Sequence, residues 1–520
     1  MKLPRLFSRL ALFVVLSARL AAEVSLGSPF TSHMVLQRDV PVPVWGTAGK
    51  GQDLTIEFAG QRKAATADAD GKWRVALDPL QASAEPRDFV VTKRNGAAAD
   101  TVTLKDVLVG EVWLASGQSN MVFPVARAKA SWAGLLNETE EIAAANHPLI
   151  RMFTATATKS YEPQEKVGGE WQVCSPETVP GFSAVGYLYA RELQNELKMP
   201  VGIVTVAYGA SCAEAWISRE SLTRDPELKF MVDSLDACVK YFRTKPEDRS
   251  GSAPIRPTPI NKPRTPNPRL TDPVQDQHFA TVLFNGMLNP VIPYAIRGAI
   301  WYQGESICWG TRGLDLYGKV QRNMIADWRA RWHSELPFYL VQLPGQENIS
   351  NNPRIREEQA RVLSVPRTGM AVTIDVGEAK NVHPHNKVPV ANRLARLALA
   401  DVYGRKLQAR SPMYQSLKVD GQVARVTFSN ASAGLSANGG GEIKGFTVAG
   451  ADRKFVPAQA RVDGDTVLVS SPDVTAPVAV RYGWDNYPEG LGCNLVSGDL
   501  PAAPFRTDTW EYPIAGIIED

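Results

Sequence analysis

The chain has 520 residues, too many for a single hydrophobic core, so two or three domains are expected. Apolar residues make up 44% and charged residues 21% of the sequence, which is typical of globular proteins. The formal net charge of +3 is too small for the electrostatic footprint of a nucleic-acid-binding protein. Past the N-terminal segment, no stretch is long and apolar enough to span a bilayer.

Residues 1–22 have the order of features found in a secretory signal peptide. Lys2, Arg5 and Arg9 come first, the apolar run LALFVVLSA follows, and small residues lead up to Ala22. We therefore expect cleavage after Ala22 and an exported protein, periplasmic or secreted, with no membrane attachment after cleavage. The segment carries four cations and no acids, so its removal would change the net charge from +3 to −1.

The cysteines and histidines argue against metal chemistry. The five cysteines are sparse, odd in number and without a CxxC pair, which disfavours a disulfide framework or a structural zinc site. One disulfide remains open, but the spacing does not identify its partners. The six histidines show no HExxH or comparable ligand spacing, so we expect no catalytic metal and no cofactor.

Residues 23–105 are expected to form an N-terminal β domain. VPVPVWG, DLTIEFAG, KWRVALDP and DFVVTKR are short runs rich in β-branched and aromatic residues. Gly, Asp and Pro separate them at close intervals, as in a β-sandwich.

Residues 106–404 predict an α/β domain. DVLVGEVWLAS, PVGIVTVAYGAS, IRGAIWYQGES, LPFYLVQLPG and GMAVTIDVGE are nearly continuous apolar runs, as expected of parallel strands buried on both faces. Between the strands, AVGYLYARELQNEL and LYGKVQRNMIADWRARW have the apolar spacing of helices. The proline-rich segment 252–273 predicts an extended loop. Residues 405–520, with runs such as VARVTFSN and PVAVRYGW, predict a second β region.

Polar residues follow each predicted strand of the α/β domain, at the edge where such sheets bind ligands. Ser119 follows the first run, Gly209 the second, Gln303 the third and His383 the last. A serine, a histidine, glycine turns and an amide at one edge are the set that acyl transfer requires.

Each of these groups has a predicted role. A serine hydroxyl is a weak nucleophile, so Ser119 needs an imidazole to accept its proton, and His383 is the best-placed histidine. The backbone N–H groups of Ser119 and Gly209 and the side-chain amide of Gln303 are candidate donors to the oxyanion. The simpler interpretation of Ser119 is a helix N-cap.

The sequence blocks that carry these residues resemble a known enzyme family. GEVWLASGQSNM, AYGASCAEAW, LFNGML…IRGAIWYQGES and DVGEAKNVHPHNK are similar to those of sialate O-acetylesterases, carbohydrate esterases of the SGNH hydrolase superfamily. MVLQRDVPVPVWG and VRYGW…LPAAPFRTD extend the resemblance to nearly the whole mature chain. The resemblance implies a three-layer, flavodoxin-like parallel sheet with accessory all-β regions of sandwich or jelly-roll type.

The same resemblance implies roles for single residues and a class of substrate. Ser119 would be the nucleophile, His383 the base, Gly209 an oxyanion donor and, by analogy, Gln303 another. The substrate would be an acetylated carbohydrate, either sialic acid or a xylan-type glycan, since bacterial relatives include acetylxylan esterases. The alternative is a non-catalytic carbohydrate-binding protein with a degenerate esterase domain.

The sequence differs from the family pattern at the position expected to hold the acid that orients His383. Lys380 occupies the position three residues before His383, where superfamily members commonly have an aspartate. Asp375 and Glu378 are the nearest acids, and a Ser–His dyad without an orienting acid is equally open, because that acid mainly orients and stabilises the imidazolium.

Two aromatic residues near the blocks, Tyr208 and Trp309, are candidates for a sugar subsite because sugars stack on aromatic faces. The sequence gives no signal for an oligomeric state.

Overall fold

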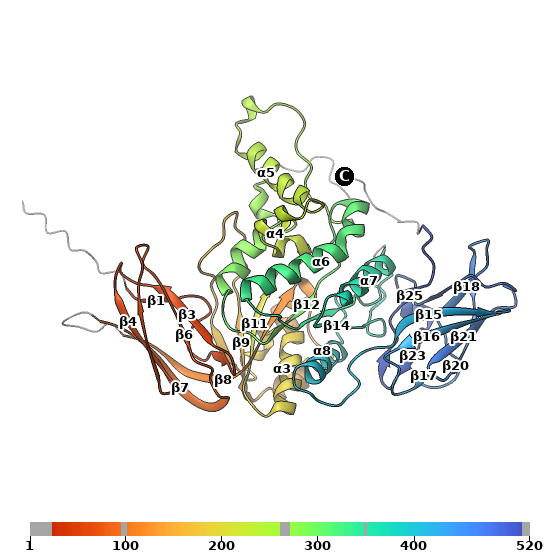
Figure 1. Ribbon diagram of the computed structural model, residues 1–520, viewed down its shortest axis with the longest axis horizontal. Helices are drawn as coiled ribbons and strands as arrows, with labels where there is room; N and C mark the ends of the chain where they lie inside the picture. Colours follow the sequence, from red (N-terminus) through yellow and green to blue (C-terminus); the bar gives the residue numbers. More distant parts are fainter. Residues whose placement is uncertain (1–22, 95–100, 261–270, 348–350, 512–520) are drawn as a thin grey trace, which may run out of the picture.

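The computed structural model describes residues 23–94, 101–260, 271–347 and 351–511 (Figure 1). The predicted signal segment lies outside these residues, as do positions 261–270 of the predicted proline-rich loop. In the described part of the chain, no helix combines the length and apolar character needed to cross a membrane.

The N-terminal residues form short antiparallel strands, which Figure 1 shows at one end of the molecule. One sheet consists of β1 (Ser25–Leu26), β3 (Val42–Thr47) and β6 (Lys72–Leu77). The strands β4 (Asp53–Phe58), β5 (Gln61–Thr66) and β7 (Ser83–Lys93) form a second antiparallel group that continues onto β8.

The strand β8 (Thr101–Gly117) belongs to both the N-terminal β region and the α/β region. Its first part pairs with β7 and with β2 (Val35–Gln37), and its second part pairs with β11 and β12. The predicted boundary between residues 105 and 106 therefore falls inside one continuous strand.

The central sheet has the strand order β10-β9-β11-β8-β12-β13-β14. The edge strand β10 is antiparallel to β9, and the other neighbours are parallel. The bounds are β9 (His147–Thr154), β10 (Trp171–Cys174), β11 (Val201–Ala207), β12 (Gly298–Tyr302), β13 (Phe338–Val341) and β14 (Thr368–Ala371). Every residue of β12, β13 and β14 is buried, which explains their apolar sequences.

Helices cover both sides of this sheet (Figure 1). The helices α3 (Ala184–Leu197) and α8 (Val388–Asp401) pack together on one side, and α6 (Gly310–Trp332) and α7 (Asn352–Arg361) lie on the other. Within the described ranges, the remaining helices of four or more residues are α1 (Ser119–Val122), α2 (Glu138–Ala144), α4 (Arg219–Arg224), α5 (Lys229–Arg243), the π-helix Phe284–Leu288 and the 3₁₀ segments Ala213–Trp216 and Pro488–Leu491.

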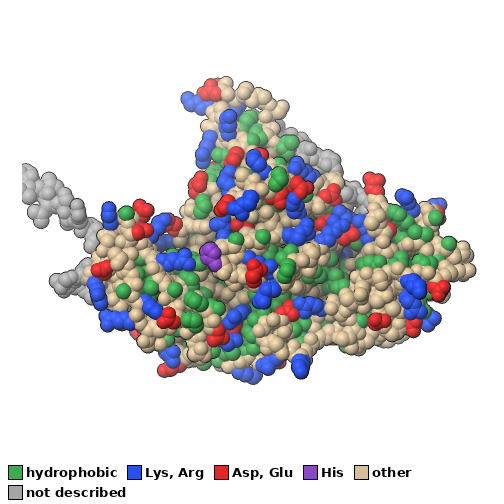
Figure 2. Space-filling view, in the orientation of Figure 1, with side chains coloured by type: hydrophobic (Ala, Val, Ile, Leu, Met, Phe, Trp, Pro, Cys, Tyr) green, Lys and Arg blue, Asp and Glu red, His purple; other side chains and the backbone are tan. Residues whose placement is uncertain are grey.

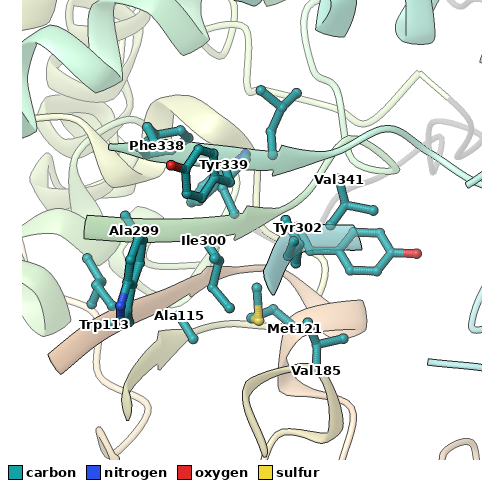
Figure 3. Packing of buried hydrophobic residues seen from close by; sticks show 14 of the residues in the cluster. Trp113, Ala115, Met121, Val185, Ala299, Ile300, Tyr302, Phe338, Tyr339 and Val341 are labelled. Carbon is teal, nitrogen blue, oxygen red and sulfur yellow. The ribbon is translucent and has the colours of Figure 1, made fainter. Parts of the chain in front are cut away.

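Large aromatic side chains join the sheet to these helices. Trp113 of β8 contacts Tyr189 of α3, and Trp301 of β12 contacts Trp328 of α6. Figure 3 shows this core and, in it, Met121 from α1. Met121 has no exposed surface, so the turn that carries the neighbouring Ser119 is anchored in the core.

The C-terminal region contains three small antiparallel sheets (Figure 1). The first consists of β15 (Met413–Asp420), β16 (Val423–Ser429), β20 (Gln459–Asp463) and β21 (Thr466–Ser470). The others consist of β17 (Leu435–Ala437), β23 (Leu495–Ser497) and β24 (Leu500–Pro501), and of β18 (Phe446–Ala449), β19 (Phe455–Pro457), β22 (Ala479–Tyr482) and β25 (Phe505–Arg506). The protein is thus a mixed α/β protein with additional all-β sheets at both ends.

Acidic and basic side chains are interspersed over the face shown in Figure 2, without a large patch of one sign.

Candidate active site

Ser119 lies where β8 ends at the carboxyl edge of the central sheet. It is the first residue of α1, and Gln118 holds the N-cap position, so Ser119 is not the cap. Gly117 has a φ of +139°, and a Cβ there would lie 2.1 Å from the carbonyl oxygen of Tyr302. Only glycine permits this approach of β8 to β12. The N–H of Gln118 also donates to the Tyr302 carbonyl, which fixes the turn before Ser119.

His383 meets Ser119 at this edge. Its Nε2 atom lies 2.8 Å from the Ser119 Oγ atom, a hydrogen-bond distance. Asn381 holds the histidine backbone: its Oδ1 accepts from the His383 N–H at 3.0 Å, and its Nδ2 donates to the His383 carbonyl at 2.9 Å. The structure therefore brings together the predicted nucleophile and the predicted base.

The surroundings of His383 keep its imidazole neutral. Burial, followed by the positive charges of Lys387 and His385, lowers the pKa of His383 to about 4. A neutral imidazole can accept a proton, which is the protonation state that a general base requires.

The two acids proposed to orient His383 contact other residues. Asp375 forms a bidentate ion pair with Arg393, with N–O distances of 2.7 and 2.6 Å. Glu378 accepts from the backbone N–H of His385 at 2.7 Å and lies 2.9 Å from the Nδ1 atom of that ring. Among the described residues, no carboxylate is hydrogen-bonded to His383. This arrangement corresponds to a Ser–His dyad without an orienting acid, one of the alternatives that the sequence left open.

The backbone of Gly209 approaches Ser119 from the turn after β11. A Cβ on Gly209 would lie 3.8 Å from the Ser119 Cβ. Within the described ranges, the N–H groups of Ser119 and Gly209 donate to no protein acceptor. Both predicted backbone donors are therefore unoccupied beside the Ser119 hydroxyl.

Gln303 does not have the arrangement predicted for it. Its Nε2 donates to the carbonyl oxygens of Ser211 at 3.1 Å and Ser306 at 2.9 Å, and its Oε1 accepts from the Tyr317 hydroxyl. Both amide hydrogens are used, because this fully buried side chain joins the loops after β11 and β12. Gln303 thus supports the site and leaves no N–H free for an oxyanion.

The sequence assigned no role to Asn120, yet this residue connects three parts of the site. Its Nδ2 donates to Glu305 and, at 2.9 Å, to the carbonyl oxygen of Val382, and its Oδ1 accepts from the Lys387 ammonium. Burial raises the pKa of Glu305 and lowers that of Lys387 to about 7. All these residues lie in the sequence blocks that carry Ser119, Gln303 and His383, but a linear pattern does not show that they meet.

The two aromatic residues predicted for a sugar subsite differ in their exposure. Trp309 is only 6% exposed and donates its Nε1–H to Glu214 at 2.9 Å, so it offers no open face. Tyr208 is half-buried at the rim, and its hydroxyl lies 3.0 Å from the Lys159 ammonium. Trp132, which the sequence did not single out, is 40% exposed, and its ring centre lies 4.5 Å from that of His383.

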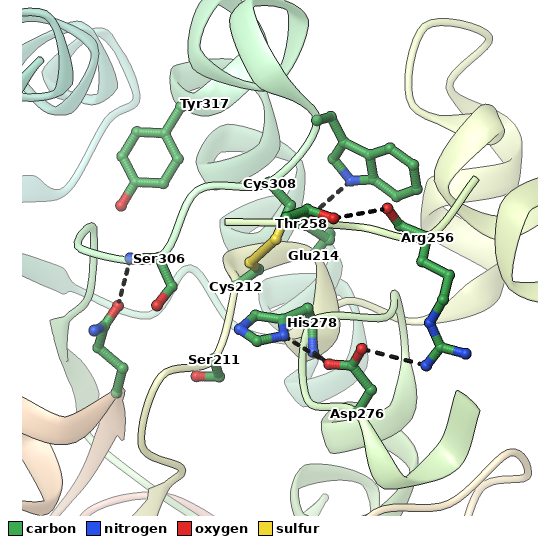
Figure 4. Close-up of a disulfide and its surroundings, with 12 residues drawn as sticks. Ser211, Cys212, Glu214, Arg256, Thr258, Asp276, His278, Ser306, Cys308 and Tyr317 are labelled. Atoms are coloured by element: carbon green, nitrogen blue, oxygen red, sulfur yellow. Dashed lines mark hydrogen bonds and ion pairs between the residues drawn. A yellow bond between two sulfur atoms is a disulfide. The ribbon is translucent and has the colours of Figure 1, made fainter. Parts of the chain in front are cut away.

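A disulfide between Cys212 and Cys308 links the loops after β11 and β12 (Figure 4). The first of these loops carries Gly209, and the second carries Gln303. Sequence spacing could not identify this pair, because the two cysteines are separated by 96 residues.

Comparisons with known proteins identify a family of carbohydrate esterases. A family model described as "Carbohydrate esterase, sialic acid-specific acetylesterase" matches residues 282–400. The sialate O-acetylesterases of Mus musculus and Homo sapiens are 28% and 27% identical to the chain, in alignments that cover 95% of it and 96% of each relative.

A solved structure, described as a novel carbohydrate acetylesterase from Xanthomonas citri, is 34% identical to the chain. The superposition has a TM-score of 0.78 and covers 94% of this chain and all of the other. None of the comparisons supports the non-catalytic alternative. The chain belongs to the sialate O-acetylesterase family of carbohydrate esterases, and the protein is an esterase.

Proposed function

We propose that the protein removes acetyl groups from sugar hydroxyls through an acetyl-Ser119 intermediate. The observation that carries this proposal is the 2.8 Å contact between His383 Nε2 and Ser119 Oγ at the carboxyl edge of the sheet. In an enzyme that belongs to a family of acetylesterases, a serine paired with a neutral imidazole is the arrangement for acyl transfer.

The first half-reaction acylates the enzyme. Ser119 Oγ attacks the acetyl carbonyl carbon while His383 Nε2 takes the hydroxyl proton. The N–H groups of Ser119 and Gly209 donate to the oxygen that becomes negative, and each such donor is worth roughly 3–4 kcal/mol of barrier in comparable sites. When the tetrahedral intermediate collapses, the C–O bond to the sugar breaks, and the imidazolium returns its proton to the departing sugar oxygen.

The second half-reaction releases acetate. His383 takes a proton from water as the water oxygen attacks the acetyl-Ser119 carbonyl, and it returns the proton to Ser119 Oγ as the acyl bond breaks. The imidazolium is transient in both steps. In this dyad, Asn381 holds the backbone of His383 by accepting one hydrogen bond and donating another, which positions the histidine without an aspartate.

The substrate we propose is an O-acetylated sialic acid or a xylan-type glycan. The support is the family model and the sialate O-acetylesterases that match over 95% of the chain. We also propose a three-layer SGNH hydrolase arrangement for the central region and export through residues 1–22, whose sequence supports a cleaved signal peptide.

Acetate release from a panel of acetylated sialic acid, acetylated xylan and simple acetyl-sugars tests this proposal. The wild-type protein should release acetate from at least one of them, and Ser119→Ala should lose at least about a thousandfold in kcat. Ser334→Ala is the matched control, since this serine is exposed at the end of α6. A Ser119→Ala variant as active as that control would exclude the mechanism.

A further inference from the structure

We propose that Trp132 is the platform on which the sugar ring of the substrate stacks. The inference rests on the proposed function and goes beyond it by assigning a subsite for the carbohydrate part of the ester.

Trp132 is unusual among the tryptophans around the site because it is open to solvent. It is 40% exposed, whereas Trp113, Trp216, Trp301 and Trp309 are each 6% exposed or less. Large aromatic surface left in water is costly, and covering it with a ligand recovers that free energy. Its Nε1–H makes no hydrogen bond to another described residue, so it can donate to a sugar hydroxyl.

The ring is held in place rather than loosely attached. It meets the buried Phe123 edge to face, with centres 5.9 Å apart and planes at 77°. The N–H of Ala133 donates to the carbonyl of Ala130, which closes a turn around the tryptophan. A preorganised aromatic ring loses little entropy when a ligand covers it.

The position of Trp132 matches where the sugar has to lie. Its ring centre is 4.5 Å from that of His383, and His383 touches the Ser119 hydroxyl. An ester carbonyl carbon attacked by Ser119 places the ester oxygen, and the sugar carbon bonded to it, within a few bond lengths of both residues. The C–H face of that pyranose ring then comes next to the open indole.

Trp132 could instead act only by holding the imidazole of His383. The two roles predict different results with small and large substrates. A residue that positions His383 affects every ester alike, whereas a stacking platform affects only esters that carry a sugar ring.

The experiment compares Trp132→Ala and Trp132→Phe with wild type on vinyl acetate and on acetylated xylo-oligosaccharide or sialic acid, whichever the wild type cleaves. Vinyl acetate is used because p-nitrophenyl acetate has a ring that could itself stack. With the sugar ester, we expect Trp132→Ala to lower kcat/KM about tenfold, mainly by raising KM, and Trp132→Phe to restore most of it. The ratio of kcat/KM for the sugar ester to that for vinyl acetate should fall by a similar factor.

Three results would overturn the proposal that Trp132 is a stacking platform. An equal loss on both esters, with a shifted pH profile, would assign Trp132 to His383 alone. An unchanged KM for the sugar ester, or a Trp132→Phe variant as weak as Trp132→Ala, would remove the stacking. Failure of the proposed function is distinguishable, because wild type and Ser119→Ala would then release acetate at the same rate.

Discussion

The imidazole of His383 lies 2.8 Å from the hydroxyl of Ser119, although 264 residues separate them in the chain. The pair forms because β8 ends at Gly117 and the segment after β14 returns to the same edge of the parallel sheet. The first residue of α1 and a loop after β14 therefore hold the reacting atoms, so the contacts between these two segments matter as much as the Ser119–His383 contact itself.

The low pKa of His383 predicts activity in acidic solution. Because burial and the charges of Lys387 and His385 lower this pKa to about 4, the imidazole should stay unprotonated down to that pH. The acid limb of kcat/KM for a non-ionising ester should therefore fall near pH 4 rather than near 6.5. Acetate release measured over a series of pH values gives this limb. A midpoint between pH 6 and 7 would show that the pKa of His383 is not lowered.

Lys387 predicts a pH-dependent stability. Its pKa is lowered from 10.5 to about 7, so above pH 7 the folded protein has lost a proton that the unfolded chain still binds. The free energy of unfolding should therefore rise with pH from about 7 to about 10.5. Urea unfolding at a series of pH values, for wild type and Lys387→Met, isolates this contribution. Identical pH slopes in the two proteins would contradict it.

Asn120 should be needed for catalysis more than for substrate binding. Asn120→Ala removes the links to Val382 and Lys387 and takes away the side-chain donor to the buried Glu305 carboxyl group. We expect kcat to fall about ten- to a hundredfold with little change in KM, and stability to fall by about 1–3 kcal/mol. Steady-state kinetics and urea unfolding give the two values. An unaltered kcat in a well-folded variant would mean that the hydrogen bonds of Asn120 do not position Ser119 and His383.

The dyad interpretation predicts mild effects at the two nearby acids. Asp375 is paired with Arg393 and Glu378 with His385, so Asp375→Asn and Glu378→Gln should each reduce kcat by no more than about tenfold. Loss of an aspartate that orients a catalytic histidine costs about ten-thousandfold. A loss of that size in either variant, measured on the preferred acetyl-sugar, would identify it as the orienting acid.

The disulfide should stabilise the protein and the loop after β11 that carries Gly209. It closes a loop of 96 residues, and removal of such a bridge typically costs about 2–5 kcal/mol. The double variant Cys212→Ser/Cys308→Ser should unfold at a lower urea concentration and lose kcat, because Gly209 lies three residues from Cys212. Reductant should destabilise wild type but not the double variant. If reductant destabilised both proteins equally, its effect would not come from the Cys212–Cys308 bond.

Much of the fold follows from sequence periodicity. The apolar spacing in AVGYLYARELQNEL corresponds to α3 residue for residue, since local spacing alone defines that helix. The sequence also predicted that Ser119 and His383 lie together, because the carboxyl ends of parallel strands meet at one edge of the sheet.

The remaining features depend on packing between distant segments. The amide of Gln303 looked available, but its partners Ser211 and Tyr317 come from other elements. Trp132 lies in a stretch without a clear pattern, and only the folded chain brings it to His383. Sequence periodicity reports which face is buried; it does not report which polar groups meet there.

The central claim is that Ser119, activated by His383, is the nucleophile. The most direct measurement is labelling with a fluorophosphonate, followed by mass spectrometry of the digested protein. We expect a single modified serine, Ser119, with activity lost in proportion to labelling, and no labelling of a folded His383→Ala variant. Modification of a different serine, or full activity in a protein labelled at Ser119, would contradict the account.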